Sequence, residues 1–282
     1  MAYSVLILTY NEMTNIGRCL DSLRPCSDVV VLDSHSTDGT PEAVTRSSAR
    51  LYSRTFDTFA GQRNWAIDNV PFEYPWVLHL DADECLTPAL HDELLTICSR
   101  DEKSAYFLAN KLIFMGQWLR RSSMYPYYQA RLLRLGESRF EQVGHGQHLA
   151  FASRGTDRLR EPYLHYNFSK GFTDWVARHN TYSSDEARRI VSRPAASAGR
   201  LLWTALIGKP GDERQQARKA LADHLPLRPL VRFLYLYIAR FGFLDGRAGF
   251  HYCMLTAIYD YLVRLKAWEL RHPSADGATS AR

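Results

Sequence analysis

The segment Trp76–Glu84 constrains the fold of this chain more than any other. It reads WVLHLDADE, so an apolar run leads directly into two aspartates separated by one alanine. The run is too short for a helix of its own and is typical of a strand buried on both faces. If that strand ends at Leu80, then Asp81 and Asp83 lie at its carboxyl edge, where open α/β sheets bind ligands.

The two aspartates are spaced i and i+2, and in an extended chain such side chains point the same way. Carboxylates so close repel each other, and the pKa of each rises unless a cation lies between them. A divalent cation resolves the conflict, because Mg²⁺ commonly uses one or two carboxylates together with substrate phosphates. The pattern therefore indicates a Mg²⁺ or Mn²⁺ site at Asp81 and Asp83. The alternative is a turn at the end of the strand with two solvated acids.

The composition is that of a folded protein from a reducing compartment. Hydrophobic residues make up 46% and charged residues 23% of 282 residues, enough for one large domain, or one domain with an appendage. Five cysteines without a C-x-x-C pair argue against a disulfide framework and a zinc site. We expect no signal peptide, because the chain enters a strand at once, and no apolar run approaches the roughly 18 residues of a spanning helix. These features predict a cytoplasmic protein.

Charge is divided unevenly along the chain. Residues 1–110 contain 8 Lys/Arg and 16 Asp/Glu, a net charge of −8, whereas residues 111–282 contain 27 and 14, a net charge of +13. This asymmetry suggests an acidic catalytic half and a basic half that faces an anionic surface. No recognisable nucleic-acid module accompanies the basic half, so we expect an anionic membrane and no nucleic acid as the partner.

The first 85 residues predict a β-α-β-α-β-α-β alternation. Strands are expected at 4–9, 28–33, 51–53 and 76–80. Helices are expected after Asn15 as a possible N-cap, after the turn that ends at Pro41, and over 57–69. This alternation gives a parallel sheet with right-handed crossovers. A dinucleotide-binding site and a P-loop are excluded, because neither G-x-G-x-x-G nor G-x-x-x-x-G-K-[ST] occurs.

Three segments at these strand ends resemble the signatures of family-2 glycosyltransferases. They are LTYNE at 8–12, VLDSHSTDGT at 31–40 and LDADE at 80–84. Their order and spacing make the resemblance far more specific than the two aspartates alone. The likeness continues through three later segments, MYPYYQARLLR at 124–134, LHY at 164–166 and GFLDG at 242–246. These resemble the bacterial branch that adds glucose or a similar sugar to lipopolysaccharide core or to lipid-linked surface polysaccharide.

The resemblance implies a GT-A fold, an α/β fold with a mostly parallel central sheet, flanking helices and a helical C-terminal appendage. We expect a catalytic domain at 1–170 with a nucleotide half (1–110) and an acceptor half (111–170), a helical region at 171–272 and a disordered tail at 273–282. The implied enzyme is an inverting, metal-dependent hexosyltransferase. Its donor is UDP-glucose or a similar UDP-hexose, and its acceptor is a lipid-linked glycan of lipopolysaccharide core or exopolysaccharide biosynthesis.

The resemblance places the donor at the ends of the first two strands. Asp33 is expected to contact uracil and ribose, since a carboxylate accepts hydrogen bonds from uracil N3–H or a ribose hydroxyl. An acid that starts an Asx-turn is the alternative. The neighbouring strand end contributes further donor-binding residues, namely Thr9, Tyr10, Asn11 and Glu12. Arg63 either reaches the uridine or the diphosphate or is a solvated charge on a helix face.

Asp83 is expected to bind the metal directly, and Asp81 to hold the ribose or the metal through water. The metal would bridge the two phosphates and stabilise the charge on the leaving nucleoside diphosphate. Direct displacement also needs a base to take the proton of the acceptor hydroxyl. The resembled branch has a His-Glu pair here, but this chain has Gly146 in place of the glutamate. Glu141 is the first candidate base. His145 is the second, or else a loop histidine bonded to backbone.

Arg131 and Arg134 are three positions apart in a predicted strand, so they lie on opposite faces and at most one faces the site. The resemblance favours Arg131. Gln129 shares its face and is placed to contact the acceptor. His165, in the segment LHYN, either binds the metal or the diphosphate or is a core histidine.

The chain after residue 170 predicts basic, aromatic-rich helices. Apolar positions recur at helical spacing in the last of them, at Met254, Ala257, Ile258, Tyr261, Leu262, Leu265 and Trp268. Such helices fit the interface of an anionic membrane and predict a peripheral protein on the cytoplasmic face of the inner membrane. The alternative is packing on the catalytic domain or on a second subunit.

Two other functions fit parts of the pattern. Sugar-nucleotide nucleotidyltransferases share the α/β plan and the metal-binding acids, but they usually carry a Gly-rich, basic loop after the first strand, where this chain has Tyr10–Glu12. A non-catalytic subunit of a polysaccharide assembly complex would keep the fold and lose the base. Gly146 favours that interpretation, whereas the intact Asp33, Asp81 and Asp83 argue against it.

Overall fold

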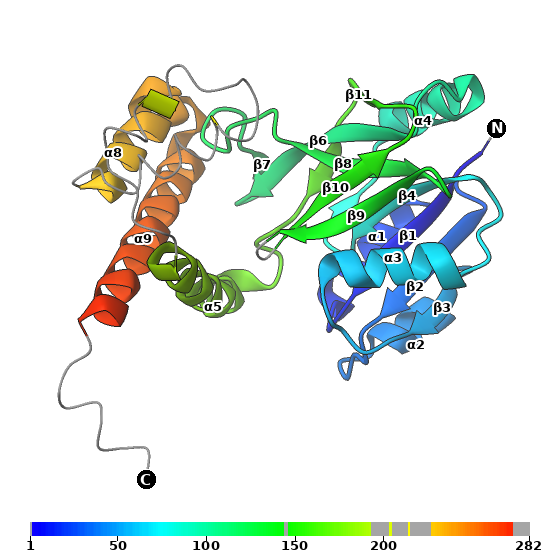
Figure 1. Ribbon diagram of the computed structural model, residues 1–282, viewed down its shortest axis with the longest axis horizontal. Coiled ribbons are helices and arrows are strands. Elements are labelled where there is room, and N and C mark those ends of the chain that lie inside the picture. Colours follow the sequence, from blue (N-terminus) through cyan, green and yellow to red (C-terminus); the bar gives the residue numbers. More distant parts are fainter. Residues whose placement is uncertain (1, 144–145, 193–202, 205–213, 215–226, 273–282) are drawn as a thin grey trace, which may run out of the picture. The chain divides into compact units, whose positions relative to one another are not determined.

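The structure is a computed structural model that describes residues 2–143, 146–192, 203–204, 214 and 227–272 (Figure 1). The chain divides into two compact units. The first comprises residues 1–120 and 124–172, and the second comprises residues 121–123 and 173–282.

The first unit begins with the predicted alternation of strands and helices. Its elements are β1 (Ser4–Thr9), α1 (Met13–Ser22), β2 (Asp28–Asp33), α2 (Thr40–Thr45), β3 (Arg50–Ser53), α3 (Phe59–Asn69) and β4 (Trp76–Asp81). The four strands are parallel and lie in the order β3-β2-β1-β4. This confirms the expected α/β architecture, in which each helix connects one strand to the next.

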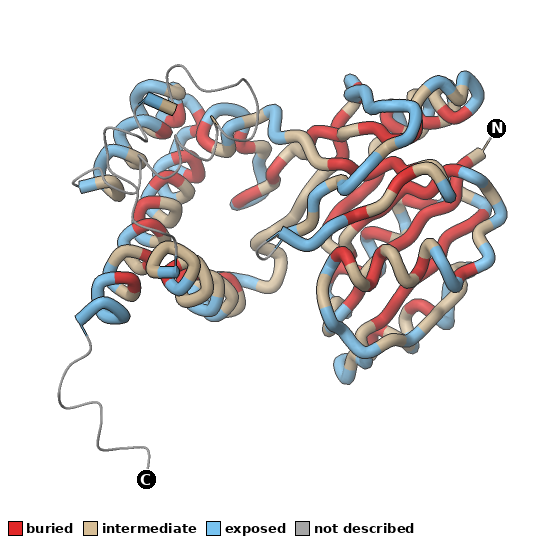
Figure 2. Tube along the Cα trace, in the orientation of Figure 1, coloured by how far each residue is buried: buried red, intermediate tan, exposed pale blue. Residues whose placement is uncertain are grey.

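The parallel strands are buried on both faces, as their apolar composition requires (Figure 2). On one face, Leu78 and Leu80 of β4 pack in the same core as Ile16 of α1 and Leu90 of α4 (Pro88–Arg100). On the other face, Val77 packs with Ala66 of α3. Side chains of β4 therefore alternate between the two layers of helices.

The second half of this unit extends the sheet with both antiparallel and parallel pairings. Its strands are β5 (Glu84–Cys85), β6 (Ala105–Phe114), β7 (Gln117–Trp118), β8 (Tyr128–Arg134), β9 (Ser138–Val143), β10 (Gly146–Ala152), β11 (Thr156–Arg158) and β12 (Tyr163–His165). β8 lies antiparallel between β4 and β6, and β12 pairs with both β6 and β5. The site strands β4, β8 and β12 thus belong to one sheet.

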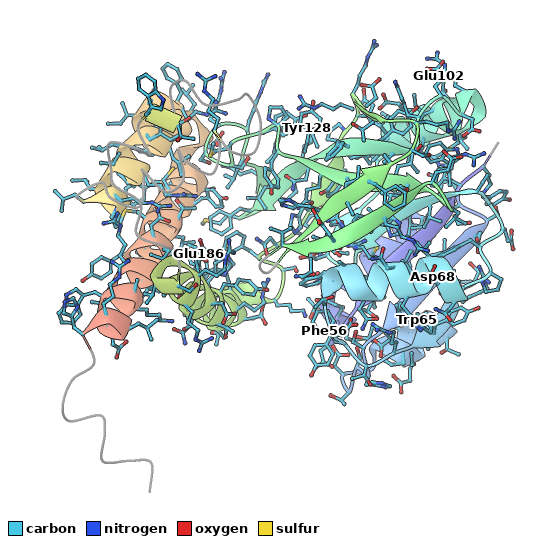
Figure 3. The ribbon with its side chains drawn as sticks, viewed as in Figure 1. Phe56, Trp65, Asp68, Glu102, Tyr128 and Glu186 are labelled. Atoms are coloured by element: carbon cyan, nitrogen blue, oxygen red, sulfur yellow. The ribbon has the colours of Figure 1, made fainter. Side chains whose placement is uncertain are left out.

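The hairpin β9–β10 packs on α3 instead of joining the sheet. Asn64 of α3 holds β9 by donating to the carbonyl of Phe140 and accepting from its N–H. Arg139 pairs with Asp68, which Figure 3 labels on α3 beside Trp65. These contacts explain how the hairpin comes to lie over a helix some 80 residues earlier in the chain.

Two details of the expected elements are wrong. Asn15 is not an N-cap: α1 begins at Met13 with Glu12 as its N-cap residue, and the Asn15 side chain donates to Glu12 from inside the helix. β4 ends at Asp81 instead of Leu80, and the chain turns at residues 82–83. Asp81 and Asp83 are consequently not successive residues on one face of an extended strand.

The second unit is helical. It contains most of α5 (Gly171–Ser192), then α8 (Arg228–Leu234), the π-helical turn η1 (Tyr235–Ala239), the 3₁₀ turn η2 (Gly242–Asp245) and α9 (Gly246–Arg271). Lys266 of α9 donates to Asn180 and Ser183 of α5. Residues 193–202, 205–213 and 215–226 of the predicted helical region 171–272, and the predicted tail at 273–282, lie outside the described residues.

Asp245 anchors the short segment 121–123 to these helices. Its Oδ2 atom accepts from the backbone N–H groups of Arg121 and Ser122 and from the Ser122 hydroxyl, at 2.7–2.9 Å. Gly249 lies where α9 crosses η2 so closely that a Cβ atom there would be 2.2 Å from the carbonyl oxygen of Gly242. None of the helices that the structure describes has the length and hydropathy needed to cross a bilayer.

Candidate active site

Three neighbouring strands bring polar side chains to one edge of the sheet. In the register of the parallel strands, Thr9 of β1 lies opposite Asp33 of β2, and Leu8 lies opposite Asp81 of β4. All three strands run in the same direction, so their carboxyl ends meet at this edge. This is the edge at which open α/β sheets bind ligands.

Asp33 is held rigidly at this edge and is only 1% exposed. Its Oδ1 accepts from the Thr9 hydroxyl at 2.9 Å and from the Ser36 hydroxyl at 2.5 Å, and its Oδ2 accepts from Ser36 N–H at 2.8 Å. The bond to Ser36 N–H forms the Asx-type turn that was the alternative for this acid. A turn of this kind orients the carboxylate and is compatible with ligand binding.

The loops after β1 and β2 are bonded to each other. Asn11 accepts from Thr37 N–H through its side chain and donates its own N–H to the Ser36 hydroxyl, both at 2.8 Å. Asn11 and His35 have positive φ angles of 52° and 61°, which are uncommon for non-glycine residues, although asparagine and histidine adopt them more readily than most. The ring of Tyr10, which is 60% exposed, projects from the same loop.

Glu12 joins this loop to a segment far along the chain. Its carboxylate accepts from Asn15 Nδ2 at 2.7 Å and pairs with Lys170 Nζ at 2.6 Å. Burial raises the pKa of Glu12 above its ordinary value, although the bonds from Asn15 and Lys170 oppose this. Lys170 was not predicted from the sequence, because nothing in its local pattern connects it with the first strand.

Two arginines bind the Asp81 carboxylate. Arg63 of α3 donates to Oδ1 at 2.6 Å, and Arg131 of β8 donates to Oδ2 at 2.9 Å. Burial on its own would raise the pKa of Asp81, but the charges of Arg131 and Arg63 outweigh it and hold that pKa well below the usual range. The sequence indicated a divalent metal ion at Asp81 and Asp83, and in the structure two guanidinium groups occupy the hydrogen-bonding positions of Asp81.

Arg63 is 1% exposed, so its interpretation as a solvated charge on a helix face is wrong. Its Nε donates to Gln147 Oε1 of β10 at 2.8 Å, which brings the hairpin to the site. Gln147 was also missed from the sequence. It lies two residues beyond the candidate base His145, which is outside the described residues, and one residue beyond Gly146.

Glu84 completes the buried network and was likewise not predicted. It is fully buried, accepts from Arg131 Nη2 at 2.5 Å and from Asp81 N–H at 2.9 Å. Burial raises the pKa of Glu84 to about 7, with Arg131 opposing the shift. Three buried guanidinium nitrogens, Nη1 of Arg63 and Nε and Nη1 of Arg131, have no hydrogen-bond acceptor among the described residues. The network is therefore rich in donors at the sheet edge.

Asp83 faces His165. Its Oδ2 atom lies 3.4 Å from His165 Nε2, and each side chain is about one-fifth exposed. Burial lowers the pKa of His165, but the neighbouring Asp83 carboxylate outweighs it and raises that pKa to about 9. The pairing of β12 with β5 sets this geometry, since His165 lies opposite Glu84 and Tyr166 N–H donates to the Asp83 carbonyl at 2.9 Å.

The structure brings Gln129 to the same face of β8 as Arg131, as predicted. Gln129 Oε1 accepts from Arg131 Nη2 at 3.1 Å and from the Tyr163 hydroxyl at 2.8 Å. Arg134 lies on the opposite face and pairs with Asp101 at 2.7 Å. The alternation of the strand thus separates the two arginines.

The candidate base Glu141 is exposed on β9, directly opposite His148 of β10. Its role remains a prediction. Among the residues that the structure describes, no group of three or more His, Cys, Asp and Glu side chains is arranged to hold a metal ion. The pair Asp83 and His165 most resembles the predicted metal site, because a carboxylate and an imidazole face each other there.

Known proteins resemble the chain over most of its length. It is 25% identical to the lipopolysaccharide core biosynthesis glycosyltransferase LpsC of Rhizobium meliloti, over 98% of this chain and 97% of that protein. It is 26% identical to the uncharacterized glycosyltransferase RC0292 of Rickettsia conorii, over 72% and 76%. Among solved structures, residues 1–349 of S. aureus TarS align with a TM-score of 0.44 and 15% identity, over 97% of this chain and 92% of TarS.

The sequence profile described as Glycosyl transferase family 2 matches residues 4–153. This range covers more than half of the chain and runs from the first residue of β1 to just past β10. It contains Asp33 at the end of β2, Asp81 at the end of β4, Asp83 in the turn after it, and Arg131 of β8. The chain belongs to glycosyl transferase family 2.

Proposed function

We propose that this protein is an inverting glycosyltransferase that moves a hexose from a UDP-sugar, most simply UDP-glucose, to a lipid-linked acceptor of lipopolysaccharide core biosynthesis. The observation that carries the proposal is the convergence of Asp33, Asp81 and Asp83 at one sheet edge, with two buried arginines beside them. A nucleoside diphosphate has a polar base, a ribose and two charged phosphates, and each of these parts requires a different kind of protein side chain.

Asp33 is the proposed partner of the nucleoside. Its carboxylate is oriented by Thr9 and Ser36, and it accepts a hydrogen bond from uracil N3–H or a ribose hydroxyl. Tyr10, whose ring is exposed on the adjoining loop, offers a surface for the base. Asn11 and Glu12 fix the shape of this loop through their bonds to neighbouring segments.

Asp83 and His165 fit a divalent cation that is also bound by the donor. One carboxylate and one imidazole lie within 3.4 Å of each other, and Mg²⁺ or Mn²⁺ commonly completes such a set with water and substrate phosphates. When bound, such an ion would lower the negative charge of the leaving nucleoside diphosphate. Asp81 is proposed to act differently, because both its oxygens already accept from arginines.

Arg63 and Arg131 are proposed to stabilise the charge that develops on the diphosphate. They are almost fully buried, and some of their N–H donors have no acceptor in the described part of the chain, so their charge is weakly screened. Glu141 is the proposed base that takes the proton of the acceptor hydroxyl, and His145 is the second candidate. Inversion follows if the hydroxyl displaces the diphosphate in one step.

The named relative LpsC and the surface of α9 support an acceptor at a membrane. Six exposed apolar residues recur every three or four positions along α9, namely Phe250, Met254, Ile258, Tyr261, Leu265 and Trp268. Exposed Arg247 and Arg271 lie at the two ends of this stripe. An apolar stripe with basic ends is typical of helices that lie in the interface of an anionic bilayer. We propose peripheral association with the cytoplasmic face of the inner membrane.

A thermal-shift panel of nucleotides tests the donor assignment. A ligand that binds only the folded state raises the melting temperature by mass action, so UDP-hexoses with Mn²⁺ should give the largest shift. Transfer is then followed as UDP release on adding lipopolysaccharide core, and the anomeric configuration of the product is read by NMR. A larger shift with GDP- or dTDP-sugars would refute the UDP assignment, and a product that retains the donor's configuration would refute inversion.

A further inference from the structure

A cavity of about 590 Å³ lies beside Asp83 in the first unit. The segment 166–169 forms one wall, the start of α1 a second, and the turn between β6 and β7 a third. Its volume is in the range of small-molecule sites. Nothing in the donor proposal uses this space.

The wall formed by residues 166–169 is fastened at both ends to candidate site residues. Tyr166 N–H donates to the Asp83 carbonyl at 2.9 Å, and Lys170 pairs with Glu12 at 2.6 Å. One wall of the cavity is therefore tied both to the donor loop that carries Glu12 and to the turn that carries Asp83. A molecule bound there would be adjacent to the site at which transfer is proposed.

The lining combines aromatic and aliphatic side chains with a few polar groups. Tyr166, Phe168, Ile113 and Met115 supply the apolar surface, and Thr14 supplies a hydroxyl. Met115 and Gly116 both have positive φ, which fixes the tight turn that holds the methionine at the cavity. Apolar walls with a small number of convergent polar groups are typical of sites for saccharide-sized ligands.

Arg18 gives the cavity its charge. Its guanidinium lies 3.8 Å from the centroid of the Tyr166 ring, and its Nη2 donates to Asn15 Oδ1 at 3.0 Å. The described residues provide no acceptor for its other N–H groups. No acidic side chain lines the cavity in the part of the chain that the structure describes. A planar cation with unused donors recognises carboxylate or phosphate oxygens.

We propose that this cavity binds the acceptor saccharide and that Arg18 selects acceptors with an anionic group, either a phosphate or a sugar carboxylate. The proposal rests on the glycosyl-transfer function proposed above. It goes beyond that function by specifying an anionic saccharide as the acceptor and Arg18 as the residue that selects it. Tyr166 and Phe168 contact the sugar ring, and Arg18, held flat on Tyr166, binds the anionic substituent.

Calorimetry on the full chain tests this with UDP present. The probe is lipopolysaccharide core oligosaccharide freed of its lipid by mild acid, which carries both phosphate and carboxylate. Arg18→Gln should weaken oligosaccharide binding about ten- to a hundredfold, the loss expected for a charged hydrogen bond, and leave UDP affinity unchanged. Arg24→Gln makes the same charge change at a side chain that is 80% exposed and should alter neither affinity.

Two modified oligosaccharides identify the anionic group. One is dephosphorylated, and the other has its carboxyl groups reduced. Wild-type protein should lose affinity for one of them, and Arg18→Gln should bind all three forms alike. If wild-type protein does not distinguish the three forms, Arg18 does not select an anion and the proposal is wrong.

Thr14→Trp fills the cavity without removing charge, and Thr14 is an exposed residue of α1, so the core is not disturbed. It should abolish oligosaccharide binding and preserve UDP binding. If both variants bind the oligosaccharide as wild type does, or both lose UDP affinity equally, the cavity is not an acceptor site. Wild-type protein that binds UDP without binding the oligosaccharide refutes only this inference, whereas a failure to bind UDP refutes the proposed function.

Discussion

Arg131 donates from β8 to the carboxylate of Asp81 on the neighbouring antiparallel strand, at 2.9 Å. The same Nη2 atom also donates to the fully buried Glu84 at 2.5 Å. One arginine therefore balances two acids at the point where the sheet is proposed to hold the diphosphate. Buried charges are tolerated only when they are paired and hydrogen-bonded, so this group of side chains should be sensitive to the loss of any member.

Arg131→Met should lower the free energy of unfolding by about 3–5 kcal/mol, because it takes the arginine partner from the buried Glu84 and leaves Asp81 with Arg63 alone. Urea denaturation measures the loss. Arg134→Met is the matched control on the opposite face of the same strand, where the partners Asp101 and Glu137 are partly exposed, and it should cost no more than about 1 kcal/mol. Equal losses of unfolding free energy in the two variants would mean that the buried network stabilises the fold no more than the partly exposed ion pairs of Arg134 do.

Asp81 at the end of β4 and Asp83 in the turn after it should behave differently when each is changed to asparagine. Asp83→Asn should abolish Mn²⁺ binding, measured by calorimetry, and sugar transfer, with a smaller loss of stability than at Asp81, because the charged partner of Asp83 is the imidazole of His165 at 3.4 Å, whereas Asp81 accepts from two almost fully buried arginines. Asp81→Asn should instead destabilise the fold, since Arg63 and Arg131 lose their shared partner. Metal-dependent transfer that survives in Asp83→Asn would remove this residue from the proposed metal site.

The sequence was sufficient to predict the parallel strands, since β1, β2 and β4 are short apolar runs that end in polar residues. It was not sufficient to predict which way the acids face, because the turn after Asp81 ends the alternation on which that prediction depended. Glu84, Gln147 and Lys170 were missed for another reason. Each reaches the site through contacts with residues distant in sequence, and a local pattern carries no signal of such pairing.

Asp33→Asn should weaken UDP binding about ten- to a hundredfold, the cost of replacing a charged acceptor by a neutral one. Calorimetry with UDP alone measures this without an acceptor. Asp28→Asn is the control at the opposite end of β2, where the acid accepts from Ser4 and Arg50 and is equally buried. It should reduce stability and leave the affinity of the folded protein for UDP intact. Unchanged UDP affinity in Asp33→Asn would mean that Asp33 only forms the turn to Ser36 and does not bind the nucleotide.

His79 should make the fold sensitive to mild acid. It is fully buried, and neither ring nitrogen has a hydrogen-bond partner among the residues that the structure describes. Burial together with Arg63 and Arg131 holds its pKa well below the ordinary value. The unfolded chain takes up a proton near pH 6.5 and the folded chain does not. Stability is therefore retained above about pH 6.5, and below it each pH unit shifts the unfolding equilibrium by up to about tenfold toward the unfolded state.

Urea denaturation at several pH values measures this slope. His79→Leu should flatten it, since no proton is then taken up on unfolding at this position. His148→Leu changes an exposed histidine of β10 and should leave the slope as it is in the wild type. If the stability of His79→Leu depends on pH as steeply as that of the wild type, groups other than His79 cause the acid sensitivity.

The apolar stripe of α9 should bind anionic vesicles. Burial of its aromatic and aliphatic side chains, together with about 1 kcal/mol from each basic residue near the surface, should give binding that weakens as salt rises. Co-sedimentation of the full chain with anionic and with neutral vesicles, at low and high salt, measures both contributions. Neutral vesicles should bind less protein at every salt concentration, because only the apolar contribution remains.

Paired substitutions locate the effect on α9. Ile258→Glu and Leu265→Glu place charge on two side chains that are 47% and 48% exposed, so they should abolish vesicle binding without unfolding the chain. Phe151→Glu makes a comparable change at a 50% exposed residue of β10 and should bind vesicles as the wild type does. If the wild type binds no anionic vesicles at low salt, the stripe does not face a membrane, and the basic half of the chain must instead be matched by the negative charge of the acceptor. Such a result would leave the donor site unaffected, because Asp33, Asp81 and Asp83 all belong to the first unit.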